Sequence, residues 1–461
     1  MWNIWIDTGG TFTDCIAISP DQERQRIKIL SSSVLRGTVK SVKGNQLEGH
    51  FSWPVESDIF SDFTFEVLQS DFEARVQKID LKNKIITLDR SIPKNIQDLE
   101  FQHTSHEEVP ILAARILTST PLDKNLPPLI MRLGSTKGTN ALLEKKGADV
   151  AFITTKGFED LLVIRDQQRP HLFSLDIQTP GPIYKSAVGI YERISSEGDI
   201  QIPLDTDNLP SEILTLPRTT SIAISFLNSY KNGIHERELK QQLEKHGFTA
   251  ISCSSELSAN IKLLERADTT VANAYLKPII STYINGIKSK IKEGKLWVMT
   301  SSGSIVDADN FHPKDSLLSG PAGGIVGAVT AARKSGFDKI ITFDMGGTST
   351  DVAIYNAKFD YQFETKVGDA TIQSPCLHIE TIAAGGGSIC DFKNGLLTVG
   401  PESAGADPGP ACYGGGGPLT ITDINLLAGR LIPEEFGIPI NPAYAEKALN
   451  RLIEKIYQRS E

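Results

Sequence analysis

The sequence predicts a layered α/β protein of two related lobes, with a small β-rich insert near the N-terminus. Residues 6–14, Ile-Asp-Thr-Gly-Gly-Thr-Phe-Thr-Asp, recur as residues 343–351, Phe-Asp-Met-Gly-Gly-Thr-Ser-Thr-Asp, with six of nine positions identical. Short apolar runs alternate with helix-like stretches through much of the chain, which is typical of α/β proteins. At 461 residues the chain exceeds one hydrophobic core, so we expect two or three domains.

The first predicted strands flank a glycine turn. Residues 4–6 form a short apolar run, and residues 11–18 continue as a second strand after Gly9 and Gly10. Between about residues 31 and 90, short alternating runs are separated by Gly, Asn and Asp, so we expect a β-rich insert there. A capping-box pattern, Ser105-His-Glu-Glu108, precedes a helix predicted over residues 109–117.

A β/α rhythm follows the insert. Pro278 should kink or break a long helix near the middle of the chain. Residues 195–211 are rich in Asp, Pro, Gly and Ser, so we expect an N-terminal domain of residues 1–195 and a second domain of residues 196–461. The predicted strands are residues 129–133, 150–154, 221–226 and 296–300, and the predicted helices are residues 141–146, 158–164, 235–246 and 268–292.

Composition excludes several classes of protein. A hydrophobic content of 40% and a charged content of 22% are ordinary for a soluble globular chain, and a net charge of -9 disfavours a broad nucleic-acid surface. The sequence shows neither a membrane span nor a signal peptide, so we expect a cytoplasmic protein. The five scattered cysteines include no Cys-x-x-Cys pair, which indicates reduced thiols and argues against structural zinc.

The first copy of the repeated motif has the chemistry of a phosphate loop. Glycine lets backbone N–H groups converge on an anion without obstruction by Cβ, so Gly9 and Gly10 could hold phosphate oxygens, with the Thr11 and Thr13 hydroxyls as further donors. A carboxylate cannot bind phosphate directly. We therefore expect Asp7 to hold Mg²⁺ through water or to orient a nucleophile.

The second copy repeats this chemistry with Asp344, Gly346, Gly347, Thr348 and Thr350. An ordinary hairpin turn is an equal explanation for one copy, but two copies with the same flanking pattern favour phosphate binding. They are far enough apart in sequence to lie in separate lobes that close on one nucleotide, so ATP is the leading ligand. P-loop, dinucleotide-binding and protein-kinase signatures do not occur.

Other glycine-rich segments are less specific. Gly385, Gly386 and Gly387 could approach a nucleotide base or ribose, or form a flexible turn. Residues 134–140 could present N–H groups to an anion, or simply cap a helix. Residues 319–328 are small enough for close helix packing, and Cys412 in the Gly- and Pro-rich segment 407–417 is interpreted as an inert thiol.

Together these motifs closely resemble the hydantoinase A / 5-oxoprolinase family, over nearly the whole chain apart from the insert. The resemblance implies an actin- and sugar-kinase-like two-lobed ATPase fold. It also implies the use of ATP to open a cyclic amide, or to drive carboxylation in the acetone carboxylase branch. The segments that carry it are residues 6–14, 134–147, 165–170, 319–327, 343–351, 384–388 and 403–414.

The resemblance assigns candidate roles. Asp7 and Asp344 become catalytic, Mg²⁺-binding residues, the glycines and threonines of both loops and residues 385–387 bind ATP, and Asn140 and Arg169 are candidate substrate residues. The implied partners are a small cyclic amide and a B-type hydantoinase subunit or domain, and a homo-oligomer is possible. Members usually carry Asp, then His or Asn, where this chain has His378 and Glu380.

The insert is longer than in the common hydantoinase pattern, and the chain resembles a truncated A-type portion without its B-type half. The mechanism implied is ATP phosphorylation of the lactam oxygen followed by attack of water. Two alternatives stay open: a kinase for a small sugar or acid, and a nucleotide-binding subunit or fragment that is inactive alone.

Overall fold

Both copies of the repeated motif fold as β-hairpins, as the sequence predicts. Asp7 faces Asp14 across the first hairpin, and Asp344 faces Asp351 across the second, so the two copies share one register. In the computed structural model these antiparallel strands are β1 (Trp2–Thr8) with β2 (Phe12–Ile18), and β19 (Lys339–Met345) with β20 (Thr350–Asn356).

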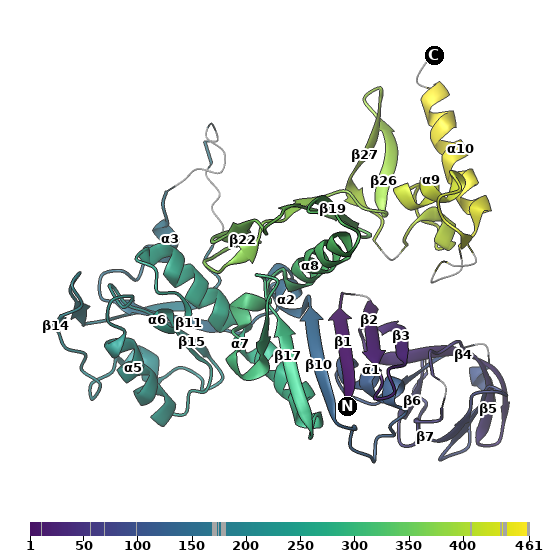
Figure 1. The fold of residues 1–461 in the computed structure, drawn as a ribbon, viewed down its shortest axis with the longest axis horizontal. Coiled ribbons are helices and arrows are strands. Elements are labelled where there is room, and N and C mark those ends of the chain that lie inside the picture. Colours follow the sequence, from purple (N-terminus) through teal and green to yellow (C-terminus); the bar gives the residue numbers. More distant parts are fainter. Residues whose placement is uncertain are drawn as a thin grey trace. The chain divides into compact units, whose positions relative to one another are not determined.

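The chain divides into two compact units, shown as a ribbon in Figure 1. The first unit is Met1–Gly323 with Tyr361–Cys376, and the second is Gly324–Asp360 with Leu377–Glu461. The structure describes residues 1–461 except 11, 56, 69, 98, 168–172, 174, 177–180, 406–407, 434–435, 437–439 and 459–461.

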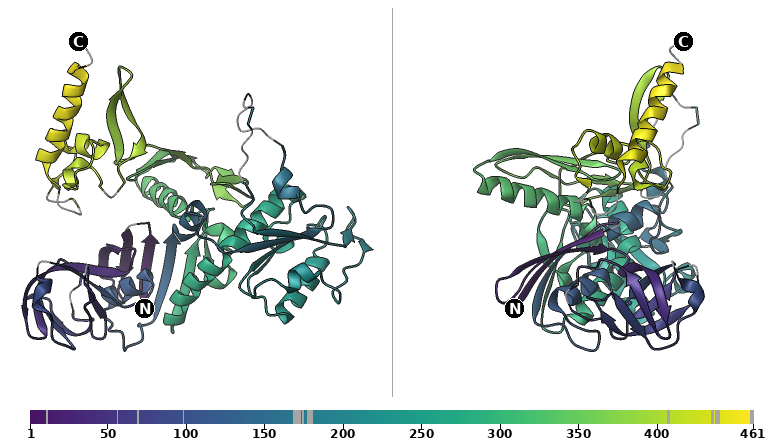
Figure 2. Two further views of the ribbon diagram at one scale, coloured as in Figure 1. Left: turned by 180° about the vertical axis from the view of Figure 1, so that it is seen from behind. Right: turned by 90° about the vertical axis from the view of Figure 1, so that its right-hand side faces the viewer.

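The first unit is built around a six-stranded sheet in the order β18-β17-β10-β1-β2-β3. Its centre is parallel, and β17, β10 and β1 lie side by side in Figures 1 and 2. Alternate residues of β1, Ile4 and Ile6, are buried and contribute to the main core, as the period of two of a strand requires. The further strands are β3 (Arg24–Leu30), β10 (Leu129–Ser135), β17 (Gly294–Met299) and β18 (Ile305–Asp307).

The β-rich insert is confirmed as a closed barrel in the order β4-β5-β8-β7-β6-β9. It extends beyond the predicted end to Thr104, because β9 is needed to close it. Phe60, Phe63, Phe65 and Phe101 fill its interior and are fully buried. The barrel strands are β4 (Val34–Lys43), β5 (Gln46–His50), β6 (Thr64–Val67), β7 (Glu73–Asp80), β8 (Ile85–Leu88) and β9 (Glu100–Thr104), with the 3-10 turn η1 (Lys94–Ile96) before β9.

The next helix, α1 (Val109–Thr118), begins where the sequence predicts, but the capping box at Ser105 is wrong. Glu108 is the N-cap residue, and no side chain caps the helix. Pro110 lies in the first turn, where its missing N–H has no helical partner to lose.

A four-stranded parallel sheet, β12-β11-β15-β16, is the second large sheet of the first unit. The long helix α7 (Leu263–Lys290) contacts β15, and it continues through Pro278 without the predicted break. The elements of this region are α2 (Lys137–Leu143), β11 (Val150–Thr155), α3 (Leu161–Ile164), β12 (Ser186–Ile190), β13 (Arg193–Ile194), β14 (Ile200–Ile202), α4 (Ser211–Leu214), β15 (Ser221–Ser225), α5 (Ile234–Lys245), β16 (Ile251–Cys253) and α6 (Ser254–Leu257).

Short elements complete the first unit. The hairpin of β22 and β23 lies against α7 through β23. These elements are η2 (Ala308–Asn310), η3 (Pro313–Ser316), β21 (Tyr361–Gln362), β22 (Thr365–Val367) and β23 (Ala370–Ile372). One boundary between the units falls within β24 (Cys376–Leu377). Helix α8 (Ser319–Lys334) contains the boundary between the two units.

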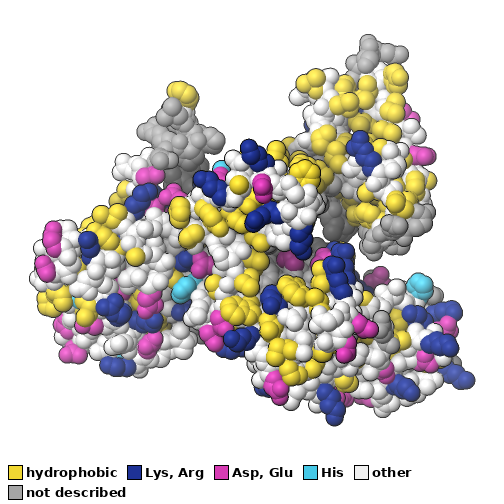
Figure 3. Space-filling model, viewed as in Figure 1, with side chains coloured by type: hydrophobic (Ala, Val, Ile, Leu, Met, Phe, Trp, Pro, Cys, Tyr) yellow, Lys and Arg dark blue, Asp and Glu magenta, His cyan; other side chains and the backbone are white. Residues whose placement is uncertain are grey.

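The second unit contains the sheet β19-β20-β25 and the hairpin β26–β27. One face of this sheet is apolar and open, because Ile341, Phe343 and Ile354 are 71%, 67% and 65% exposed. Hydrophobic side chains also gather over β26, β27 and α10 in Figure 3. The remaining elements are β25 (Glu380–Ile382), β26 (Ser388–Lys393), β27 (Leu396–Ser403), η4 (Ala411–Tyr413), α9 (Ile421–Leu427) and α10 (Pro442–Gln458). Among the helices described, none combines the length and apolar character needed to cross a membrane.

Candidate functional site

The predicted carboxylate of the first loop lies near the end of β1, where two parallel strands meet. Asp7 pairs in register with Gly134 at the end of β10. Its Oδ1 is 3.1 Å from the position that a Cβ on Gly134 would take, and 3.9 Å from the corresponding position at Gly320 in α8. Gly134 therefore leaves the room that the Asp7 carboxylate occupies.

The glycine turn beside Asp7 has the same geometry in both copies of the motif. The Gly9 N–H donates to the Phe12 carbonyl at 3.0 Å, and at the equivalent position the Gly346 N–H donates to the Ser349 carbonyl at 2.9 Å. A glycine turn of this kind brings backbone N–H groups close to an anion, since no Cβ obstructs the approach. The internal repeat is thus a repeat of structure as well as of sequence.

A cavity of about 330 Å³ lies beside the first loop. Gly9 and Gly10 line it together with Asn140 from α2. The Asn140 Nδ2 is 3.6 Å from the position that a Cβ on Gly10 would take. The structure therefore brings the predicted substrate residue next to the predicted phosphate-binding glycines.

Lys137 also lines this cavity, and sequence reasoning did not single it out. Its ammonium lies 3.3 Å from Glu108 Oε2 and 4.2 Å from the centroid of the Tyr283 ring. The Tyr283 hydroxyl donates to Thr8 Oγ1 at 3.4 Å, and burial raises the pKa of this phenol, so it stays protonated as a donor. The only feature of the sequence that could have indicated Lys137 was its position as the one basic residue in the segment Gly-Ser-Thr-Lys-Gly, residues 134–138.

The threonines and the arginine predicted at the first site are placed differently. Thr13 is fully buried, and its Oγ1 lies 2.9 Å from Ser31 Oγ, so its hydroxyl is already hydrogen-bonded inside the fold. Thr11 and Arg169 lie outside the described residues.

The second loop and the third glycine motif are packed on each other within the second unit. The Gly386 N–H donates to the Gly346 carbonyl at 2.9 Å, and the Gly387 N–H donates to the Gly347 carbonyl at 2.7 Å. A Cβ on Gly385 would come within 2.6 Å of the Gly347 carbonyl carbon, so only glycine fits there.

Other predicted residues of the second loop also contact this arrangement. The Thr350 hydroxyl donates to the Ala384 carbonyl. Asp344 Oδ2 is 3.8 Å from the position that a Cβ on Gly324 in α8 would take. Thr348 lies against Gly385, whose missing side chain lets the Thr348 nitrogen approach.

Asp423 holds the Gly- and Pro-rich segment near this loop, and sequence reasoning missed it. Its fully buried carboxylate accepts from the backbone N–H groups of Ala411, Cys412 and Thr420 at 2.7–3.1 Å. The capping box formed by Thr420 and Asp423 at the start of α9 was the available signal. Burial raises the pKa of the Cys412 thiol to about 12, which fits the interpretation of an inert thiol.

The departure from the family pattern at residues 378 and 380 forms an ion-pair cluster in the second unit. His378 Nδ1 lies 3.0 Å from Asp360 Oδ2, and His378 Nε2 lies 3.1 Å from Glu380 Oε1. The hydrogen bond to Asp360, together with that to Glu380, raises the pKa of the imidazole. The cluster therefore favours the imidazolium form.

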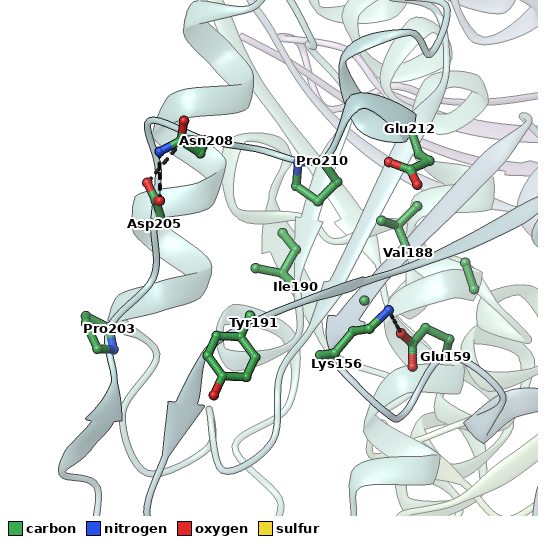
Figure 4. Close-up of a pocket in the computed structure, with 12 residues that line it drawn as sticks. Lys156, Glu159, Val188, Ile190, Tyr191, Pro203, Asp205, Asn208, Pro210 and Glu212 are labelled. Carbon is green, nitrogen blue, oxygen red and sulfur yellow. Dashed lines mark hydrogen bonds and ion pairs between the residues drawn. The ribbon is translucent and has the colours of Figure 1, made fainter.

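A larger cavity, of about 700 Å³, lies beside the edge strand β12 in the first unit (Figure 4). Lys156 pairs with Glu159 at 3.0 Å on one side, and Asp205 accepts from Asn208 on the other. None of the glycine motifs reaches this cavity. We therefore place the candidate site at the smaller cavity, where the first loop, Asn140 and Lys137 meet.

The carboxylates of Asp7 and Asp344 suit Mg²⁺ bound through water rather than a dedicated metal cage. In the described part of the chain, no group of three or more His, Cys, Asp and Glu residues is arranged to hold a metal ion. Each carboxylate instead stands beside glycines, with space for solvent. Mg²⁺ usually keeps several waters and binds one or two carboxylates plus substrate phosphates, so the residues fit this ion.

The fold matches solved structures of ATP-dependent enzymes. The ATP-dependent caprolactamase from Pseudomonas jessenii matches with a TM-score of 0.69 and 25% identity, over 98% of this chain and 59% of that chain. A nucleotide-free structure of acetone carboxylase matches with a TM-score of 0.63 and 20% identity, over 98% of this chain and 58% of that chain. These matches confirm the predicted fold class.

Sequence comparison identifies the family. The model of the hydantoinase/oxoprolinase N-terminal region matches residues 114–247, and the hydantoinase/oxoprolinase model matches residues 266–460. The chain therefore belongs to the hydantoinase/oxoprolinase family, as its motifs indicated.

Relatives named 5-oxoprolinase are considerably longer than this chain. The one from Saccharomyces cerevisiae is 41% identical over 78% of this chain and 30% of its own length. The one from Dictyostelium discoideum is 36% identical over 87% of this chain and 35% of its own length. The chain thus spans about a third of these relatives.

Proposed function

We propose that the chain is the ATP-handling part of a cyclic-amide hydrolase of the 5-oxoprolinase type. The observation that carries this proposal is the duplicated Asp-x-Gly-Gly loop, whose two copies share one register and one turn hydrogen bond. Relatives named 5-oxoprolinase and the fold of the caprolactamase support the same class of reaction.

ATP is needed because an unstrained lactam resists hydrolysis. Resonance between the nitrogen and the carbonyl makes the carbon a poor electrophile. In the proposed reaction, the lactam oxygen attacks the γ-phosphorus, the bond to the bridging oxygen breaks, and ADP leaves. Water then adds to the activated carbon, the C–N bond breaks as the nitrogen takes up a proton, and an acyl phosphate is left on the opened ring. A second water hydrolyses this acyl phosphate, which releases phosphate and leaves a carboxylate.

In this proposal the glycines and the aspartates of the two loops have different roles. Gly9, Gly10, Gly346 and Gly347 let N–H groups of the two turns approach phosphate oxygens, while the Gly9 and Gly346 N–H groups themselves close the turns on the Phe12 and Ser349 carbonyls. Asp7 and Asp344 would hold Mg²⁺ through water, which when bound neutralises phosphate charge. Positioning and electrostatic stabilisation are the main contributions a protein makes to phosphoryl transfer.

The proposal extends to partners. A B-type hydantoinase subunit or domain would complete ring opening, and a small cyclic amide is the substrate. The length of the 5-oxoprolinase relatives, about three times the matched part, agrees with a further component of this kind.

Asp7→Asn and Asp344→Asn test the proposal. With the B-type partner and 5-oxoproline supplied, we expect each variant to lose at least about 100-fold in ATP hydrolysis, because the carboxylate that would hold Mg²⁺ through water loses its charge while side-chain size is kept. Asp14→Asn is the control: Asp14 belongs to the same hairpin as Asp7, but its partly exposed side chain pairs with Lys28 at 2.8 Å.

Near-native turnover in either Asp variant would contradict the assignment of the loops. Bicarbonate-dependent consumption of a ketone, in place of lactam opening, would move the chain to the acetone carboxylase branch. A stable phosphorylated sugar or acid would instead support a kinase.

A further inference from the structure

We propose that the open apolar face of β19 and β20, together with the free edge of β19, is a docking surface for a helix and a strand of a second polypeptide. This polypeptide corresponds to the part of the longer relatives that this chain does not match. The chain covers 30% of the Saccharomyces cerevisiae relative and 59% of the caprolactamase chain, so both are long enough to contain such a segment. The inference concerns assembly and does not depend on the proposed reaction.

The two copies of the repeated hairpin differ in how far one face of the hairpin is buried. In the first copy, Ile4 and Ile6 of β1 are 0% and 3% exposed. The residues at the same positions of β19 in the second copy, Ile341 and Phe343, are 71% and 67% exposed. A face that belongs to the core in one copy is therefore open in the other.

The second strand of each hairpin repeats this difference. Ala17, which faces Ile4 across the first hairpin, is fully buried, whereas Ile354, which faces Ile341 across the second, is exposed. The apolar residues occupy the same positions of the same strand pair, so only the cover over them differs. Large contiguous apolar patches are rare on monomeric proteins and mark interaction sites.

The first copy shows what covers this face. Helix α1 contacts β1, β2 and β3, and its apolar residues lie in the same core cluster as Ile4 and Ile6. Strand β10 follows α1 in the chain and pairs with β1 in parallel. In the described part of the second unit, β19 is an edge strand and its apolar face is not covered. The missing elements are thus a helix and a parallel strand, in that order.

The free edge of β19 offers main-chain hydrogen-bonding groups. In the first copy, the Trp2 N–H at the start of β1 donates to the Pro128 carbonyl, just before β10, at 3.0 Å. Every second residue of a strand faces the same neighbouring strand, so the equivalent groups of Lys339, Ile341 and Phe343 face the free edge. Unpaired N–H and C=O groups at a sheet edge readily pair with another strand.

The repeat also predicts the direction and the end of the docked strand. At the end of β10, a Cβ on Gly134 would lie 3.1 Å from Asp7 Oδ1, so glycine leaves room for the carboxylate. A strand docked on β19 in the same way ends beside Asp344. We therefore expect glycine at that position of the second polypeptide, which would complete the surroundings of the second loop.

A second copy of this chain fits the surface less well. Two identical edge strands that pair across a two-fold axis run antiparallel, because the axis reverses the direction of the strand. The first copy of the repeat instead has a parallel strand together with a helix. The occupant is therefore a different polypeptide segment.

The test is co-expression of the whole chain with a tagged probe, the segment of the Saccharomyces cerevisiae 5-oxoprolinase that follows its match to this chain. We expect a one-to-one complex, with slower hydrogen exchange in residues 339–345. Ile341→Asp should weaken the affinity at least about tenfold, because docking would bury its carboxylate against apolar surface. Lys339→Pro removes one N–H from the free edge and leaves the apolar face intact, so it should weaken the affinity about two- to tenfold.

Ile200→Asp is the matched control. Ile200 lies in β14 of the first unit and is 51% exposed, so its replacement should leave the affinity unchanged. Ile341 is exposed in the chain alone, and the melting temperature of Ile341→Asp alone should stay close to that of the wild type, which separates lost docking from misfolding. The inference is overturned if no complex forms, if Ile341→Asp binds like the wild type, if Ile200→Asp loses as much affinity, or if the wild type dimerises through β19 and excludes the probe.

Discussion

Replacing Gly385 by alanine would place a Cβ within 2.6–2.7 Å of three backbone atoms of the second loop. These atoms are the Gly347 carbonyl carbon and oxygen and the Thr348 nitrogen. Real Cβ atoms essentially never approach so closely, and backbone cannot rotate away as a side chain can. The loop and the third glycine motif must therefore move apart.

The size of the effect follows from the contacts that this movement breaks. Restoring ordinary van der Waals distance requires a displacement of roughly 0.8 Å, and overpacking of this kind costs about 1–3 kcal/mol. The hydrogen bonds from Gly386 to Gly346, at 2.9 Å, and from Gly387 to Gly347, at 2.7 Å, would also weaken. At about 0.5–1.5 kcal/mol each, the total local destabilisation is about 2–6 kcal/mol.

Hydrogen exchange followed by mass spectrometry measures this locally, in peptides covering residues 343–351 and 380–390. We expect faster exchange there in Gly385→Ala, and weaker MgATP binding by calorimetry. Gly327→Ala is the control, because it adds a Cβ with nothing within 4 Å at an exposed position of α8, where alanine favours the helix by about 0.5–1 kcal/mol. Unchanged exchange and MgATP affinity in Gly385→Ala would refute the packing of loop on loop.

Two histidines give opposite pH dependences. His103 is fully buried among the barrel rings, neither ring nitrogen has a hydrogen-bond partner among the described residues, and burial lowers its pKa to about 3. The unfolded chain binds this proton near pH 6.5, so the free energy of unfolding should fall by about 1.4 kcal/mol for each pH unit below 6.5, down to about pH 3. His103→Phe should reduce this acid sensitivity in denaturant melts, and an unchanged slope would contradict the assignment. The pKa of His378 is raised by its bonds to Asp360 and Glu380, so its stabilising contribution is complete below the unfolded pKa and is lost as pH rises through the folded one. NMR titration should give a His378 pKa above 6.5, and this pKa should fall more in Asp360→Asn than in Glu380→Gln. A His378 pKa at or below 6.5 would show that the two carboxylates do not stabilise the imidazolium.

Local signals in the sequence were enough to predict the two hairpins. A Gly-Gly turn between an apolar strand and an alternating strand specifies its own pairing, so the register of Asp7 with Asp14 follows from neighbouring residues. The β-rich insert was predicted for the same reason, from its alternation. Its true end was not, because β9 belongs to the barrel through contacts with β4 and β6, far back in the chain.

The parts of the candidate site that sequence reasoning missed depend on contacts between distant segments. Lys137 lies beside Glu108, the N-cap residue of α1, and beside Tyr283 of α7, and neither contact can be predicted from the residues next to Lys137 in the sequence. The capping box at Asp423 can be recognised from the sequence. Its hydrogen bonds from Ala411 and Cys412 cannot, because they form only when the loop before α9 folds back on it. Of the kink or break predicted at Pro278, the break does not occur: α7 has buried residues on both sides of Pro278, and their packing can offset a lost hydrogen bond.

The duplication retains the hairpin and changes what surrounds it. At the first copy, the neighbouring strand β10 is parallel, and its Gly134 makes room for the Asp7 carboxylate. At the second copy, β25 is antiparallel to β20, and the residues after it, beginning at Gly385, make room for the loop backbone itself. Gly134 thus leaves room for a side-chain oxygen of the first loop, whereas Gly385 leaves room for main-chain atoms of the second. The first copy consequently keeps a cavity with Asn140 and Lys137 beside its glycines, whereas at the second copy the Gly386 and Gly387 N–H groups of the third motif donate to the Gly346 and Gly347 carbonyls and hold the loop in place.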